Sequence, residues 1–172
     1  ELIRNASAEE RAANAQPPAG PDWSSEGLPP GWSSWKRPGT GGKLTWTNRA
    51  ARTGKMCLCA EGVTAATFHQ VARVKPGEVY VAGVYARGKV PEKARVELAI
   101  QWMDAAGKWF GAPRQSSVLK AGDYPEWQRL AMAFEVPEGA ANAWVGAVVY
   151  DLEPEQAILF DDMTLKKAET AP

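Results

Sequence analysis

The sequence predicts an all-β fold, an antiparallel β-sandwich of the jelly-roll type with about nine to ten short strands. Short runs of alternating apolar and polar residues recur from Trp32 onward, as in strands with one buried face. Turn residues close these runs, for example Lys75-Pro76-Gly77, and hardly any segment has a helical period. The length of 172 residues suits one domain, so residues 1–172 are expected to fold as a single unit.

The predicted strands follow in chain order, separated by Pro-, Gly- and Asp-containing turns. They are residues 32–36, 44–47, 55–60, 67–74, 79–87, 95–103, 128–136, 143–150 and 158–165. The segment at about 10–31 is rich in Pro, Gly and Ala, which predicts a long loop.

Composition narrows the possible partners. Twenty basic and twenty acidic residues cancel, which gives no electrostatic reason to expect nucleic acid or an anionic membrane. No apolar stretch approaches the roughly 18 residues that span a bilayer. Because the chain begins at Glu1 rather than Met, we expect a mature or excised piece. Cys57 and Cys59 share one strand face, but residues two apart in a strand are at the upper distance limit for a disulfide, so both thiols are expected to be free. A zinc site is not expected either, because the sequence has a single His and no other Cys to complete it.

Two adjacent carboxylates, Asp161 and Asp162, lie inside an otherwise apolar predicted strand. Side chains alternate along a strand, so one of the two is expected to face inward, with no obvious cationic partner beside it. A buried carboxylate is costly unless it is paired, hydrogen-bonded or bound to a metal. Calcium with oxygen ligands from several segments would remove this cost, and Glu9 near the other end of the chain is a candidate ligand. The alternative is that both aspartates are solvated at a strand end.

Strand parity also predicts a ligand-binding surface. Tyr85 and Arg87 share one face of their strand, opposite a set of apolar residues. Glu97 and Gln101 likewise share one face of the next strand. Together they are expected to form a wet face on which Glu and Gln bind sugar hydroxyls beside an aromatic ring. The alternative is a solvated sheet face with an Arg87–Glu97 ion pair across the strands.

A series of short motifs occurs in a familiar order along nearly the whole chain. The motifs are Asn5 to Glu9, Pro30-Gly31-Trp32, Gly54 to Leu58, Pro76-Gly77-Glu78-Val79-Tyr80, Trp102 to Gly107, Trp127 to Pro137, and Phe160-Asp161-Asp162-Met163. This set resembles the calcium-containing β-sandwich carbohydrate-binding modules of families four, nine, sixteen and twenty-two, which are jelly rolls like galactose-binding domains. Ala8 departs from the family pattern, which has Phe at this position.

The resemblance implies a non-catalytic module that binds a polysaccharide, a plant or microbial β-glycan, and that is covalently linked to a secreted, glycoside-active catalytic domain. The module is expected to be a monomer in an extracellular or periplasmic location. The resemblance also implies a structural calcium ion held by Glu9, one of Asp161 and Asp162, and backbone carbonyls near Lys55.

Eight tryptophans are many for a chain of this size, and sugars stack their C–H faces on aromatic rings. Trp32, Trp102 and Trp127 match framework positions of the family and are expected in the core. The expected stacking platforms are Trp35, Trp109 and Trp144, while Arg114 is expected at the rim of a cleft. His69 is expected to be a packed surface residue rather than a ligand-binding one.

Two other functions are compatible with the sequence. A structural sandwich that packs against a catalytic domain without binding sugar would gather the exposed tryptophans into one apolar patch. A jelly-roll glycosidase or lyase would need two carboxylates about 5–10 Å apart in a cleft, for which Glu97 with Asp104 or Glu135 with Asp151 are candidates. The sequence contains no nucleophile elbow, phosphate-binding loop or paired-His metal motif.

Overall fold

A computed structural model describes residues 1–10 and 24–169 of the chain. Within these ranges the chain has no helix and forms eleven strands, in agreement with the predicted all-β class. The strands are β1 Ser24–Ser25, β2 Ser33–Lys36, β3 Lys43–Thr47, β4 Cys57–Glu61, β5 Ala65–Arg73, β6 Val79–Val90, β7 Arg95–Met103, β8 Gln115–Leu119, β9 Gly122–Glu135, β10 Asn142–Tyr150 and β11 Ala157–Lys167. No helix in the described residues is long and apolar enough to cross a membrane.

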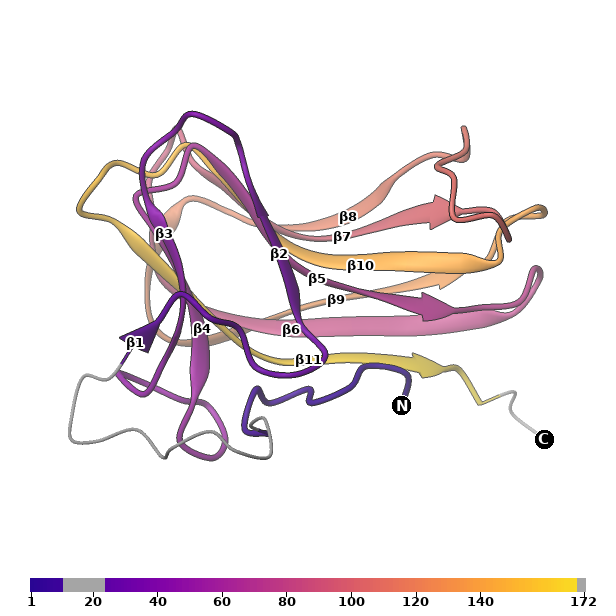
Figure 1. Ribbon diagram of the computed structural model, residues 1–172, viewed down its shortest axis with the longest axis horizontal. Coiled ribbons are helices and arrows are strands. Elements are labelled where there is room, and N and C mark those ends of the chain that lie inside the picture. Colours follow the sequence, from indigo (N-terminus) through magenta and orange to yellow (C-terminus); the bar gives the residue numbers. More distant parts are fainter. Residues whose placement is uncertain (11–23, 170–172) are drawn as a thin grey trace.

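The strands form two antiparallel sheets that pack face to face (Figure 1). The six-stranded sheet has the order β1-β3-β4-β11-β6-β9, and the five-stranded sheet has the order β2-β5-β10-β7-β8. Consecutive strands often belong to different sheets, as β6 and β7 do. Neighbours in sequence therefore lie on opposite layers of the sandwich, which matters for the position of the functional side chains.

Alternation along each strand builds the core between the sheets. In β7, Val96, Leu98, Ile100 and Trp102 are buried in one continuous cluster. Phe68 of β5 meets Phe160 of β11 edge to face at 6.2 Å between ring centroids. Each such buried apolar side chain stabilises the fold by about 1.5–3 kcal/mol.

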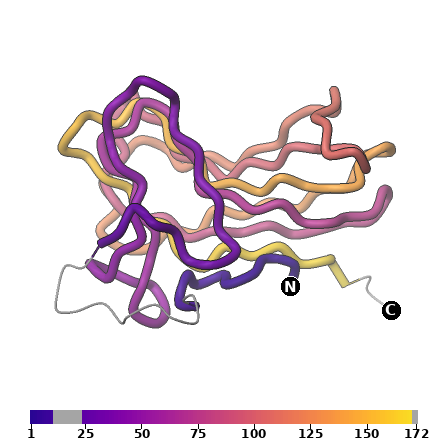
Figure 2. The backbone as a smooth tube through the Cα atoms, in the orientation of Figure 1, coloured from indigo at the N-terminus to yellow at the C-terminus, as the bar shows by residue number. Residues whose placement is uncertain are grey.

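The N-terminal residues run beside β11 rather than forming a strand of their own (Figure 2). The backbone N–H of Leu2 donates to the carbonyl of Leu165 at 2.8 Å. The Gln70 side chain is buried and binds both backbone groups of Arg4, accepting at 3.1 Å and donating at 2.7 Å. These contacts attach the N-terminal segment to both sheets, so the two ends of the described chain lie close together.

The nine predicted strands are confirmed, and the range 95–103 matches β7 at both ends. Strands β1 and β8 were not predicted. Residues 11–23 of the predicted loop at 10–31 lie outside the described residues, and 24–25 form β1 instead of loop. Trp32 and Trp102 are buried as predicted, but Trp127 is only half-buried and does not belong to the core cluster.

The cysteine prediction is also confirmed, because Cys57 and Cys59 are both free and buried. Burial raises the pKa of Cys57 to about 12 and that of Cys59 to about 11. Both thiols therefore stay protonated at neutral pH and act as small packing groups.

Candidate functional site

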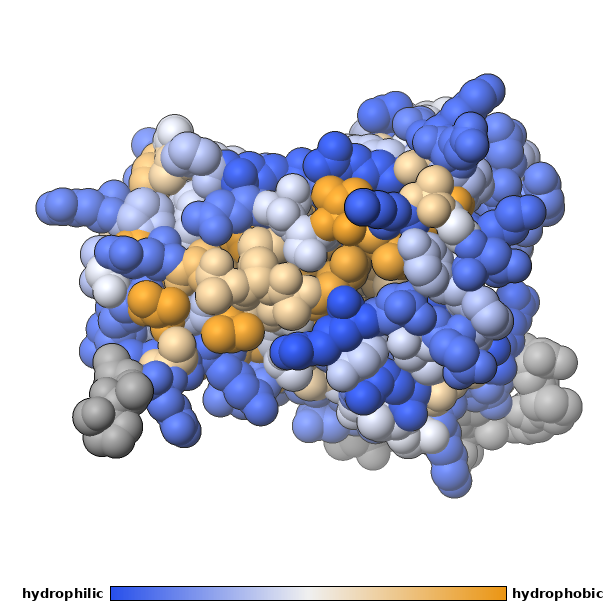
Figure 3. Space-filling view, turned by 180° about the vertical axis from the view of Figure 1, so that it is seen from behind, coloured by the Kyte–Doolittle hydropathy of each residue, from blue (hydrophilic) through white to orange (hydrophobic). Residues whose placement is uncertain are grey.

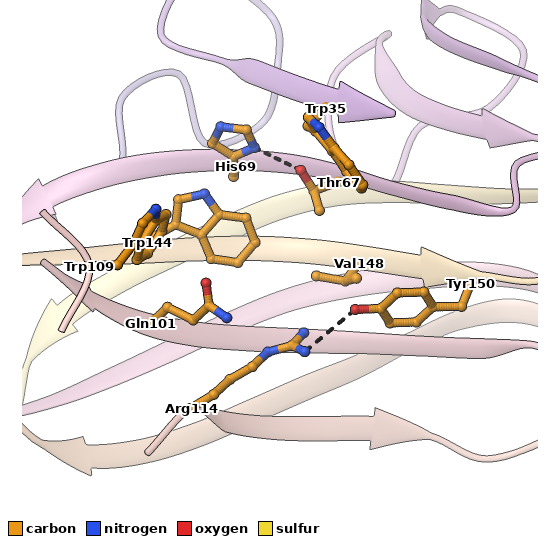
Figure 4. Close-up of a pocket in the computed structure, with 9 residues that line it drawn as sticks. All are labelled: Trp35, Thr67, His69, Gln101, Trp109, Arg114, Trp144, Val148 and Tyr150. Carbon is orange, nitrogen blue, oxygen red and sulfur yellow. Dashed lines mark hydrogen bonds between the residues drawn. The ribbon is translucent and has the colours of Figure 1, made fainter. Parts of the chain in front are cut away.

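A cleft with a volume of about 430 Å³ lies on the outer face of the five-stranded sheet (Figure 4). A volume of this size is typical of small-molecule and cofactor sites. The residues that line it are Trp35, Thr67, His69, Gln101, Trp109, Arg114, Trp144, Val148 and Tyr150. Five of the eight predicted ligand-binding residues come together here: Trp35, Gln101, Trp109, Arg114 and Trp144.

Strand alternation supplies the floor of the cleft. On β10, Ala143, Val145, Ala147 and Val149 belong to the core, so Trp144, Val148 and Tyr150 face outward. Gln101 of β7 lies opposite Trp144 in the antiparallel register, and Thr67 of β5 lies opposite Val148. The side chains that line the cleft are therefore held by paired central strands, which makes the floor rigid.

The ring of Trp144 lies flat along its own strand. A Cβ atom built on Gly146 would come within 2.8 Å of Cζ2 of Trp144 and closer still to its Cη2 atom, so the indole occupies the space above the glycine backbone. His69 packs against this indole with ring centroids 5.1 Å apart and planes tilted by 33°. Trp109 meets it edge to face, at 6.4 Å and 67°. Trp144 is thus the centre of an aromatic cluster and is itself only 9% exposed.

Two further tryptophans at the sides of the cleft are open to solvent. Trp35 comes from the edge strand β2 and is 47% exposed, while Trp109 comes from the β7–β8 connection and is 55% exposed. Figure 4 shows both rings standing beside the floor formed by β5, β10 and β7. Large exposed aromatic rings beside a cleft present flat apolar faces to a ligand.

Polar groups are interleaved with these rings. The hydroxyl of Thr67 is 2.8 Å from Nδ1 of His69, which leaves Nε2 of the ring for other partners. Burial lowers the pKa of His69, so the imidazole is neutral at pH 7. Gln101 adds an amide that both donates and accepts hydrogen bonds. Such groups match the hydroxyls of a sugar, which also donate and accept.

The Glu97 carboxylate is completely buried beneath one end of the cleft. One of its oxygens accepts from Nε of Arg95 at 2.6 Å, and the other accepts from Arg114. Arg114 also reaches the Tyr150 hydroxyl at 3.4 Å. Glu97 therefore holds Arg114 at the cleft, and its own carboxylate is buried rather than part of the wet face that was predicted.

Tyr85 and Arg87 do not belong to this cleft, contrary to prediction. Both lie on β6 in the six-stranded sheet, whereas Glu97 and Gln101 lie on β7 in the five-stranded sheet. The chain crosses from one layer to the other between these strands, so their outward residues lie on opposite sides of the molecule. The alternative Arg87–Glu97 pair fails for the same reason.

Four cleft residues were not predicted to bind a ligand: Thr67, His69, Val148 and Tyr150. The sequence predicts that all four face outward, because each alternates with core residues of its strand. Which strands would be neighbours was not readable, and β5 becomes part of the site only through its pairing with β10.

The two aspartates that were predicted to bind a metal, Asp161 and Asp162, form hydrogen bonds with residues 52–53. Asp161 accepts from the backbone N–H of Arg52 at 2.7 Å and of Thr53 at 3.3 Å. Asp162 accepts from the Arg52 guanidinium at 2.8 Å and from the Thr53 hydroxyl at 2.6 Å. Asp161 is buried, as was expected of one of the two, while Asp162 is half-buried, and the strand register shifts between Asp161 and Thr164. Arg52, which is distant in sequence, forms its ion pair with Asp162 and gives the buried Asp161 only its backbone N–H.

Glu9, the third predicted metal ligand, comes from the other end of the chain and forms hydrogen bonds with the adjacent residues 55–56. Its Oε1 atom accepts from the backbone N–H of Lys55 at 2.8 Å and of Met56 at 2.6 Å. Burial raises the pKa of Asp161 to about 7, which marks a carboxylate short of positive charge. The described part of the chain has no group of three or more His, Cys, Asp or Glu side chains that could hold a metal. Two carboxylates suit calcium, but backbone carbonyls would have to complete its ligands.

Neither predicted pair of catalytic carboxylates faces the cleft. Both oxygens of Glu97 are taken by arginines, and Asp104 accepts from the amides of Ala106 and Lys108 in its turn. Glu135 belongs to β9 of the other sheet. No Asp or Glu is among the residues that line the cleft.

Comparison with protein families finds one that matches residues 1–149, and it is described as a carbohydrate binding domain. Comparison with curated protein sequences finds no match.

Solved structures with a similar fold include carbohydrate-binding modules. A family 16 carbohydrate-binding module is 20% identical with a TM-score of 0.58, and the match covers 96% of this chain and 99% of that one. The modules of Clostridium thermocellum endo-1,4-β-D-xylanase 10B complexed with xylohexaose are 14% identical with a TM-score of 0.54. That match covers 83% of this chain and 27% of the xylanase chain. The enzymatically active domain of bacteriophage CBA120 tailspike protein 4 is 18% identical with a TM-score of 0.64. That match covers 80% of this chain and 19% of the tailspike chain. The chain thus spans about a fifth of the tailspike chain and about a quarter of the xylanase chain.

Proposed function

The chain belongs to the carbohydrate binding domain family and is a non-catalytic binding module, and on this premise we propose that the cleft of the five-stranded sheet binds a stretch of a β-linked polysaccharide. The observation that carries the proposal is the pair of exposed rings, Trp35 and Trp109, beside a floor of Trp144, His69 and Gln101.

The arrangement suits the chemistry of a sugar ring. The C–H faces of the sugar pack on the exposed indoles, whose two side-chain torsions lose little entropy on binding. The hydroxyls at the edge of the ring meet Gln101, the His69 Nε2 atom and Arg114. Because the cleft is open to solvent along its length, binding is weak for each sugar and grows with chain length.

The structural-spacer alternative predicts a single apolar patch made of the exposed tryptophans. Instead, two polar residues of β5, Thr67 and His69, lie between Trp35 of β2 and Trp144 of β10, because β5 pairs with both of these strands. This interleaving supports sugar binding over packing against a neighbouring domain.

We also propose the setting in which the module works. It is a monomer in an extracellular or periplasmic protein and is covalently linked to a catalytic domain that acts on the same polysaccharide. Tethering raises the local concentration of cleavable bonds near the catalytic domain. The support is the family, together with the xylanase whose modules share this fold.

Calcium is a further part of the proposal. Glu9 and Asp161 clasp the segment 52–56 from opposite ends of the chain. A calcium ion held by these carboxylates and by backbone carbonyls near Lys55 would neutralise the buried Asp161 and tie the terminal segments together. This role is structural, because β11 belongs to the sheet opposite the cleft.

Affinity electrophoresis tests the binding proposal. The isolated chain would be run through gels that contain soluble glucans, xylans, mannans or galactans. Retardation by at least one class is expected, with loss of retardation in Trp35→Ala and Trp109→Ala. Trp127→Ala is the matched control, because this tryptophan lies on the six-stranded sheet, away from the cleft. Equal retardation of all three variants would rule out the cleft as the binding site.

A further inference from the structure

A second hollow lies on the outer face of the six-stranded sheet, on the other side of the molecule from the cleft. Its volume is about 380 Å³, and side chains from β6, β9, β11 and the segment 52–53 line it. Figure 3 shows the molecule from behind, with an apolar area in the middle of the surface and charged side chains beside it. This hollow has no part in the proposed glycan cleft.

The hollow is strongly cationic although the whole chain has no formal net charge. Arg52, Arg129 and Lys166 line it together with a single carboxylate, Asp162. The Asp162 carboxylate is fully engaged, since one oxygen binds Arg52 and the other binds the Thr53 hydroxyl. In the described ranges, Arg129 and Lys166 form no ion pair. Two unneutralised cations therefore face the same hollow.

Gly83 lies beneath two of the groups that line the hollow and lets them come close to the sheet. A Cβ atom built there would lie 3.5 Å from Nη2 of Arg129 and 3.2 Å from Oγ1 of Thr164. Gly83 itself is buried, so the guanidinium and the hydroxyl converge over its backbone and cover it, where β6 pairs with both β9 and β11. A glycine inside a strand often marks a place where a ligand approaches the backbone closely.

Apolar and aromatic groups border the same hollow. The guanidinium carbon of Arg52 lies 3.5 Å from the centroid of the Tyr85 ring, and Asp162 accepts a hydrogen bond from the same guanidinium. Val81 and Tyr85 stand on either side of Gly83 along β6 and line the hollow. The hollow therefore combines cationic donors, a hydroxyl and an apolar wall.

We propose that this hollow binds a carboxylated sugar, a hexuronate unit of an acidic polysaccharide. The carboxylate would lie on Arg129 and Lys166, because a guanidinium matches a carboxylate with two parallel hydrogen bonds. The sugar ring would lie in the hollow with a hydroxyl on Thr164 and its apolar face toward Val81 and Tyr85. A neutral sugar would leave the two cations unpaired, and an inorganic anion would leave the apolar wall unused.

The site is independent of the proposed cleft, so each proposal can fail alone. With two sites on opposite faces, the module would hold a neutral glycan on one side and an acidic glycan on the other. Because the sites face opposite ways, such a module would link two polysaccharide chains that lie on either side of it.

An NMR titration of the ¹⁵N-labelled chain tests the site. The probes are trigalacturonate and its uncharged trimethyl ester, at equal concentration and low salt. Trigalacturonate is expected to give saturable amide shifts around Gly83, Arg129 and Thr164, which weaken with added NaCl because exposed charges are screened. The methyl ester is expected to give no such shifts. In R129Q/K166Q the affinity for trigalacturonate is expected to fall at least tenfold, while Lys120→Gln, which removes an exposed cation outside the hollow, leaves it unchanged.

Four results would overturn the proposal. The ester could bind as tightly as the acid, or R129Q/K166Q could bind as tightly as the natural chain. Sodium phosphate at matched ionic strength could give the same shifts with the same affinity, which would identify a general anion site instead of a sugar site. Trigalacturonate could shift only the amides of the cleft. Because R129Q/K166Q changes only exposed side chains, its far-UV circular dichroism and retardation by neutral glycans serve as folding controls.

Discussion

The indole of Trp144 lies over the backbone of Gly146, two residues further along the same strand. Outward positions on a strand normally carry side chains that would lift such a ring from the sheet. Because residue 146 has none, the ring lies flat and supports both His69 and Trp109. The shape of the cleft floor thus depends on a residue that offers no functional group of its own.

Replacing Gly146 with alanine is therefore expected to damage binding more than folding. The new methyl group would collide with the Trp144 ring, which would tilt into the cleft. We expect at least a tenfold loss of glycan affinity by isothermal titration calorimetry and a loss of stability of about 1–3 kcal/mol. Gly41→Ala is the matched control, because no atom lies near its added methyl group. Unchanged affinity in Gly146→Ala would show that the flat ring does not matter.

Glu97 is expected to support the cleft through Arg114. In Glu97→Gln, two arginines lose a buried acceptor charge, and a loss of stability of about 1–3 kcal/mol is expected from urea unfolding. Affinity should fall as well, because Arg114 is released. The variant Arg114→Gln should show the same loss of affinity. The double variant Glu97→Gln/Arg114→Gln completes the comparison. If Arg114→Gln lowers the affinity as much in the Glu97→Gln background as it does in the natural chain, the two residues act independently.

These residues also show how far sequence reasoning reaches. Alternation correctly separated the core of β7, such as Leu98, from its outward residues, such as Gln101, because alternation is local. The same reasoning wrongly joined Tyr85 to Gln101, because the layer to which a strand belongs depends on long-range pairing. The sequence also gave no sign of the Arg52–Asp162 pair, whose members are 110 residues apart. Exposed aromatic residues were easier to predict, since Trp35 and Trp109 lie at an edge or in a connection.

The stability of the chain is expected to depend on the protonation of His69. Burial lowers the pKa of His69 below its ordinary value of 6.5, so the unfolded chain binds the proton at higher pH than the folded chain does. The stability from neutral His69 is present above pH 6.5 and is lost as the pH falls through the folded pKa. Urea unfolding of the natural chain and His69→Gln, measured from pH 7.5 to 5, checks this. The difference between the two free energies of unfolding at each pH cancels the contribution of other groups that titrate in this range. A difference that does not change with pH would contradict the prediction.

Calcium is expected to stabilise the chain against heat. A ligand at one hundred times its Kd adds about 2.7 kcal/mol, a shift of several degrees in Tm. Differential scanning calorimetry with 2 mM calcium or with a chelator should show this shift in the natural chain and in Asp123→Asn, whose carboxylate is exposed on β9. Glu9→Gln should show little shift. The same Tm with calcium and with the chelator would mean that Glu9 and Asp161 hold no ion.

The most direct test of the central claim, that the cleft of the five-stranded sheet binds the glycan, is an NMR titration with the neutral oligosaccharide retained in the electrophoresis panel. Amide shifts should concentrate at residues 67–69 of β5, 99–101 of β7 and 144–150 of β10, which line the cleft floor. Shifts concentrated on β6, β9 and β11, with none on these three strands, would contradict it.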